Sequence, residues 1–122
     1  MSIFQSTLRF TYNAQRDPET NTGHLDVRVQ FRSQEGHGFY VYFTGVLQID
    51  EKWMEVFTEG PKAQTLDFGE NYWLSAPILE TSHPDFKWVE RSEFVGELRW
   101  VVDEDGSVAV ENAIYKVKPS TV

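Results

Sequence analysis

Residues 93–117 read EFVGELRWVVDEDGSVAVENAIYKV, and this stretch decides the fold class. Two β-rich runs, 93–102 and 107–117, flank the turn DEDG. Within that turn Asp105 and Gly106 form a strong hairpin signal, because this pair adopts the left-handed backbone that tight hairpin turns need. The stretch therefore predicts an antiparallel hairpin near the end of the chain.

Similar runs recur upstream at intervals of about ten residues, which is typical of an antiparallel sandwich or barrel. Phe4–Tyr12 alternates apolar and polar side chains and ends in the loop DPETNTG. Residues 25–32 place apolar side chains on one face and charged ones on the other. A shorter strand is expected at Trp53–Phe57.

The run FYVYFTGVLQI, residues 39–49, is apolar on both faces and predicts a strand that is buried on two sides. Gly45 within this run predicts a bulge or bend, which is a way of curving a sheet into a barrel. Residues 72–81 form a further strand candidate, in which Pro77 indicates an edge position or a bulge with irregular pairing.

The segment SHPDFKWVER, residues 82–91, is the exception to the strand pattern. Ser82 can cap a helix and Pro84 suits its first turn, so one or two helical turns are expected there. We therefore predict an all-β fold over residues 1–122. It would be one small, calycin-like, antiparallel up-and-down barrel of about eight strands, at least seven, with at most one short helical turn.

The composition limits the classes of partner that the chain is expected to bind. The net charge is −8, and an acidic field repels phosphate backbones and anionic lipids, so neither nucleic acid nor membrane is expected as a partner. There is no cysteine, no basic and apolar leader, and no apolar run of membrane-spanning length, which together favour a cytoplasmic location. The two-sided apolar run and the 15% aromatic content predict a homodimer.

The sequence contains no clear motif for a metal or cofactor site. His24, His37 and His83 lie in or beside predicted loops, and they lack the i, i+2 or i, i+4 spacing that brings ligands together. No nucleophile motif or phosphate-binding loop is evident. We therefore expect neither a metal nor a cofactor.

With these classes set aside, we expect acid–base or binding chemistry in an aromatic-lined cavity. The catalytic candidates are Glu80, Tyr42 and Arg28. The ligand-binding candidates are Tyr40, Trp73, Trp88 and Arg99. For the arginines the alternative is an exposed cross-strand ion pair, because buried charges are costly. For the aromatic side chains the alternative is ordinary core packing.

Glu80 is expected to carry the most functional weight among the carboxylates. It follows the apolar run WLSAPIL and precedes the corner with Pro84, which places it at a barrel mouth. Partial desolvation there would raise its pKa towards a range useful for proton transfer. The alternative is that Glu80 caps or braces the following turn.

Two blocks of sequence resemble a known family. These are GHGFYVYFTGVL and PILETSHPDFKWVERSEFVGELR, followed by IYKV. The block E-T-x-x-P-x-[FY]-x-W is the most specific part, and it reads here as Glu80, Thr81, Pro84, Phe86 and Trp88. Over residues 24–117 the chain resembles the family catalogued as domain of unknown function 3237, in a short form similar to its fungal branch. The resemblance implies a closed or nearly closed antiparallel barrel that is often dimeric.

Three functions stay open at this point. One is a cofactor-free isomerase, cyclase or hydro-lyase that acts on a small hydrophobic metabolite, with Tyr42, Glu80 or Arg28 moving a proton or stabilising an enolate. Another is a non-catalytic carrier with the same apolar cavity. The third is a structural or oligomeric module whose interior is filled by side chains. A cavity that holds a carboxylate or tyrosine would favour the first.

Overall fold

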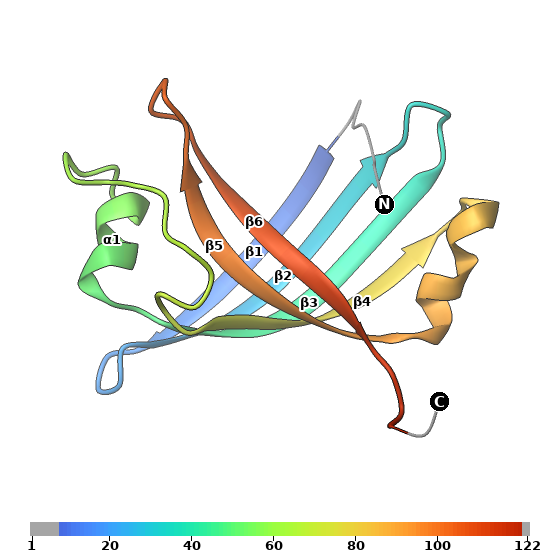
Figure 1. Cartoon of the computed structure of the whole chain (residues 1–122), viewed down its shortest axis with the longest axis horizontal. Coiled ribbons are helices and arrows are strands. Elements are labelled where there is room, and N and C mark those ends of the chain that lie inside the picture. The colour runs from blue at the N-terminus through green and yellow to red at the C-terminus, as the bar shows by residue number, and fades with distance from the viewer. Residues whose placement is uncertain (1–7, 121–122) are drawn as a thin grey trace.

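The structure, a computed structural model, describes residues 8–120, with side chains described from residue 16 onward. One antiparallel sheet contains six strands in chain order and curls strongly (Figure 1). The strands are β1 (Leu8–Asp17), β2 (Thr22–Arg32), β3 (Gly38–Gln48), β4 (Trp73–Thr81), β5 (Glu93–Val102) and β6 (Val108–Val117). Between them lie the helix α1 (Glu51–Phe57) and the 3₁₀ helix η1 (Pro84–Arg91).

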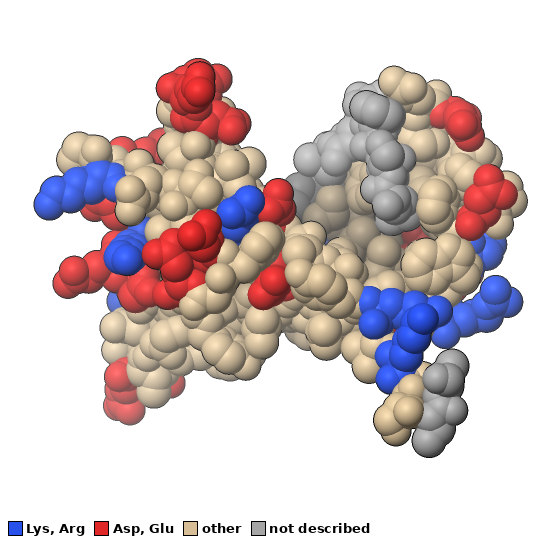
Figure 2. Space-filling view, viewed as in Figure 1, with Lys and Arg blue, Asp and Glu red and all other residues tan. Residues whose placement is uncertain are grey.

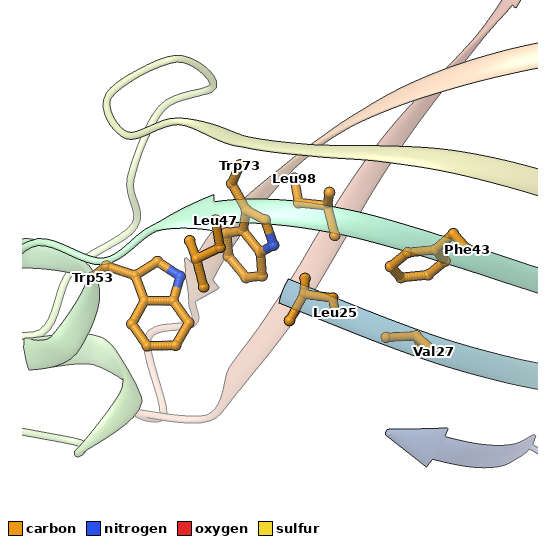
Figure 3. Packing of buried hydrophobic residues seen from close by; sticks show 7 residues of the cluster. All are labelled: Leu25, Val27, Phe43, Leu47, Trp53, Trp73 and Leu98. Carbon is orange, nitrogen blue, oxygen red and sulfur yellow. The ribbon is translucent and has the colours of Figure 1, made fainter. Parts of the chain in front are cut away.

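The core forms on the concave face of the sheet, where the period-two pattern places apolar side chains. Figure 3 shows the main cluster, to which four strands and α1 contribute. Its buried members are Leu25, Val27, Phe43, Leu47, Trp53, Trp73 and Leu98. Each large apolar side chain buried in this way contributes about 1.5–3 kcal/mol. Because side chains of β2 and β5 share one cluster, the curled sheet surrounds the core on its concave face.

The prediction of a strand at Trp53–Phe57 is wrong, because this segment forms α1. The backbone N–H of Trp53 donates to Asp50 Oδ1 at 2.8 Å, so Asp50 acts as the N-cap. Trp53 and Val56 are buried three positions apart on one helix face. The helix covers the end of the core next to Trp73, where Trp53 and Trp73 meet edge to face.

Of the bulge or bend predicted at Gly45, the bulge is wrong, since β3 pairs with β2 and with β4 in unbroken register around it. Gly45 instead allows close approach, because a Cβ added there would lie 2.7 Å from the Leu74 carbonyl oxygen. Pro77 lies in an interior strand rather than at an edge. The expected irregular pairing is confirmed, because β4 pairs with β5 only at residues 74–75.

The all-β antiparallel fold is confirmed, but the expected count of about eight strands is wrong for residues 8–120, which contain six. Two helical segments also replace the single helical turn expected. One predicted strand became α1, and the start of the first, residues 4–7, lies outside the described residues. Within the described part of the chain the ladders run from β1 to β6, with no pairing between those two strands.

Charge is distributed unevenly over this fold. Figure 2 shows acidic side chains gathered around α1 and at the tip of the β5–β6 hairpin, with basic side chains towards the C-terminal end. On the face in view, acidic side chains therefore gather mainly at the α1 end, where a few basic ones lie among them. Neither helix in residues 8–120 is long and apolar enough to cross a lipid bilayer.

Candidate functional site

Two loops meet at the end of the sheet opposite α1 (Figure 1). One is the β2–β3 turn, and the other is the corner between β4 and η1. Gly38 N donates to Ser82 Oγ at 2.9 Å, Ser82 N donates to the Gly38 carbonyl at 3.1 Å, and Thr81 Oγ1 donates to the same carbonyl at 2.8 Å. These hydrogen bonds hold together two segments that are 44 residues apart in sequence.

An open hollow of about 690 Å³ lies beside this junction. It takes residues from β2, β3, β4 and η1. The lining consists of Gln30, Phe31, Arg32, Gly38, Phe39, Tyr40, Glu80, Thr81, Ser82, Lys87 and Glu90. The rings of Phe31 and Phe39 stack with centroids 5.3 Å apart and nearly parallel planes. The lining therefore includes aromatic residues together with two basic and two acidic ones, although Phe39 itself is only 5% exposed.

Glu90 braces the β4–η1 corner. Its Oε1 accepts hydrogen bonds from Thr81 N at 3.1 Å and from Lys87 Nζ at 3.0 Å. The bond from the Thr81 backbone, followed by that from Lys87, holds the pKa of the Glu90 carboxyl below its ordinary value. Beneath it, Val89 packs with Leu79 and Phe94 in a second buried cluster.

Two of the predicted site residues, Tyr40 and Glu80, line the hollow together. They are cross-strand partners in the β3–β4 ladder, which explains why they lie side by side. Glu80 is exposed on the convex face of the sheet. The desolvated environment predicted for it is therefore wrong, and the brace considered as the alternative for Glu80 is provided by Glu90 instead.

Tyr42 and Arg28 form a pair of their own outside the lining of the hollow. They are cross-strand partners in the β2–β3 ladder, and Arg28 Cζ lies 4.5 Å from the centroid of the Tyr42 ring. Arg28 also donates to Asp26 Oδ1 at 2.7 Å. The catalytic trio is therefore split, with Glu80 in the hollow and the other two residues elsewhere on the convex face.

The other three predicted ligand contacts are dispersed. Trp73 is a core residue, buried against Trp53 and Trp100. Trp88 is exposed on η1, with Lys116 Nζ 5.3 Å from its ring centroid. Arg99 donates to Glu111 Oε1 at 2.9 Å, the cross-strand ion pair considered as the alternative. None of the three lines the hollow.

The structure brings together two histidines that the sequence did not. His37, in the β2–β3 turn, and His83, the N-cap of η1, have ring centroids 4.3 Å apart. Glu35 lies against both, and the three ligating atoms lie within 4.8 Å of one another. The expectation that the histidines do not converge is wrong for this pair. No spacing signal could reveal it, because the partners come from different loops.

The segment that carries these groups also matches a family model, which covers residues 11–117. The chain belongs to the family "Protein of unknown function (DUF3237)". This confirms the resemblance inferred from the sequence blocks around Gly38 and Glu80. No curated protein matches this DUF3237 chain.

Solved structures of low sequence identity share the fold. A protein of unknown function from Clostridium acetobutylicum ATCC 824 is 20% identical, with a TM-score of 0.63 over 90% of this chain. A beta-barrel like protein from Acinetobacter baumannii AYE is 16% identical, with a TM-score of 0.57 over 90% of this chain. The chain spans 66% and 64% of the length of these two structures.

Proposed function

We propose that this DUF3237 chain binds a small amphipathic molecule in the hollow at the β2–β3 end of the sheet. The observation that carries the proposal is the mixed lining, in which the aromatic residues Phe31 and Tyr40 line one hollow with Arg32 and Lys87. An aromatic or aliphatic body would contact the rings, and an anionic or hydroxyl group would pair with the basic side chains or Tyr40.

Binding fits this hollow better than the isomerase, cyclase or hydro-lyase reading. Proton transfer needs an acid or base within hydrogen-bond reach of a bound substrate, and a second group to stabilise the charge that develops. Tyr42 and Arg28 lie outside the lining, and Glu80 is exposed. The mixed charge of the lining also suits an amphipathic ligand better than a purely hydrophobic one.

The test is a titration with 2-naphthoate, an aromatic carboxylate, followed by amide chemical shifts in NMR. We expect saturable shifts confined to residues 30–32, 38–40 and 80–82, with weaker binding in Arg32→Gln. Arg28→Gln is the matched control, because it removes an exposed guanidinium of the same strand outside the hollow. Absence of saturation up to about 1 mM, or shifts that map elsewhere, would contradict the proposal.

A homodimer is a second proposal, supported by the convex face of the sheet. Six large apolar side chains on β3–β6 are 40–58% exposed there. They are Val46, Leu74, Ile78, Val95, Tyr115 and Val117. Val46 pairs with Leu74 and Val95 pairs with Tyr115 across neighbouring strands, so the exposure forms patches rather than scattered points. A second copy of the chain is the partner that we propose for this face.

A further inference from the structure

We infer that Glu35, His37 and His83 form a binding site for a divalent transition metal ion, with Zn²⁺ as the ion to test. The site lies next to the hollow. Gly38, which follows His37, and Ser82, which precedes His83, both line the hollow. The inference does not rest on small-molecule binding there.

The distances from Glu35 to the two histidines are those of ligands around a common point, and all three ligating atoms lie within 4.8 Å of one another. Glu35 Oε2 lies 3.6 Å from His37 Nε2 and 3.7 Å from His83 Nε2. Hydrogen bonds between such groups are about 2.7–3.0 Å long, so these contacts are too long for them. Zinc bonds of about 2.0–2.1 Å place neighbouring ligand atoms of a tetrahedron about 3.4 Å apart. The observed separations are close to that spacing.

The chemistry of the three groups suits the same class of ion. Two imidazole nitrogens and one carboxylate form a donor set used by zinc, which leaves a fourth position open. Two imidazoles with centroids 4.3 Å apart would repel each other if both were protonated, whereas a shared cation is attracted to both lone pairs. The chain has no cysteine, so thiolates offer no competing site.

The loops that carry the ligands are held in place without the metal. His37 N donates to Ser33 Oγ at 3.2 Å, and Ser33 N donates to the His37 carbonyl at 2.9 Å, which closes the β2–β3 turn. His83 N donates to Thr81 Oγ1 at 3.0 Å. The His83 ring also packs edge to face on Phe86, at 4.7 Å between centroids. The two histidines, whose loops are fixed in this way, lose little conformational entropy when an ion binds, whereas the exposed Glu35 side chain is ordered by the ion.

One hydrogen bond must change when the ion binds. Asp85 N donates to His83 Nδ1 at 3.2 Å, so in the neutral ring the proton is on Nε2, the nitrogen that faces Glu35. Coordination through Nε2 moves this proton to Nδ1 and breaks the bond from Asp85. A typical hydrogen bond of this kind contributes modestly to stability, and ligation of the ion compensates for its loss. The Asp85 amide therefore reports directly on coordination by His83.

The experiment titrates ZnCl₂ into the tag-free chain, with heat as one signal and amide chemical shifts as the other. We expect one Zn²⁺ per chain and a large shift of the Asp85 amide. His37→Gln and Glu35→Gln should weaken binding at least about tenfold, since even indirect partners of a metal ligand have effects of that size. His83→Asn keeps an oxygen that can cap η1 while it removes the imidazole, and it should weaken binding similarly.

His24→Gln is the matched control, because His24 is exposed at the far end of β2 from the cluster and should bind Zn²⁺ like the wild type. Far-UV circular dichroism verifies that each variant folds. If His83→Asn does not fold, Zn²⁺ binding by His37→Gln alone tests the inference. The inference is overturned if no saturable binding occurs up to about 1 mM Zn²⁺. It is equally overturned if His37→Gln and His24→Gln bind Zn²⁺ alike.

Discussion

Glu90, and not Glu80, is the carboxylate that fixes the corner between β4 and η1. The sequence identifies Glu80 because it lies between the end of an apolar run and the corner that contains Pro84. The strand pattern, however, turns the Glu80 side chain to the convex face while Thr81 is buried. Glu90 reaches the Thr81 amide from the following helix, across nine residues. Only the path of the chain through the corner reveals this contact.

Replacement of Glu90 by Gln should reduce stability at neutral pH and matter less in acid. The pKa of Glu90 is lowered in the folded chain, so its ionised form contributes stability above its ordinary value of 4.5. That contribution falls as the pH drops through the lowered pKa of the folded state. Below that pH, Glu90 is protonated in both the folded and the unfolded state. Urea unfolding of wild type and variant across this range measures the difference. Glu104→Gln, in the exposed β5–β6 turn, is the control.

At the scale of elements, period-two alternation predicted strands better than it predicted breaks in them. The terminal hairpin formed with β5 at the predicted residues and β6 one residue shorter. The failure at α1 has a physical reason. Within five residues, Trp53 and Phe57 satisfy a strand pattern, whereas Trp53 and Val56 satisfy a helical one. The cap at Asp50 was the signal that favours the helix, and it was present in the sequence.

Removal of that cap tests whether α1 depends on it. Asp50→Ala should destabilise the chain by about 0.5–2 kcal/mol, because the Trp53 amide loses its side-chain acceptor. Asp50→Asn keeps an acceptor oxygen and should lose much less. Chemical denaturation monitored by tryptophan fluorescence is suitable, since Trp53 packs against Trp73 and Trp100. Equal destabilisation by both variants would show that the carboxylate charge, and not the cap, is what matters.

At the scale of the whole molecule, the sequence predicted the candidate sites only in part. Tyr40 and Glu80 were identified and share the hollow, because neighbouring strands place them opposite each other. The pairing of His37 with His83 depends instead on how two loops close over one end of the curled sheet. Hydrogen bonding between the Gly38 and Ser82 backbones establishes that closure. A glycine or a serine in the sequence does not show which residue it will bond to in the fold. A chemical cluster built from two loops therefore needs the fold before it can be seen.

The proposed homodimer belongs to this scale as well, and its test depends on which face of the sheet is altered. Ile78 is 58% exposed on the convex face, so Ile78→Lys should bury a charge in the dimer and convert it to a monomer. Val110 is 49% exposed but lies on the concave side of β6, opposite Trp100, so Val110→Lys should leave the dimer intact. Light scattering over a range of protein concentrations measures the mass of each. A monomeric wild type, or equal effects of the two variants, would show that the convex face does not join two copies.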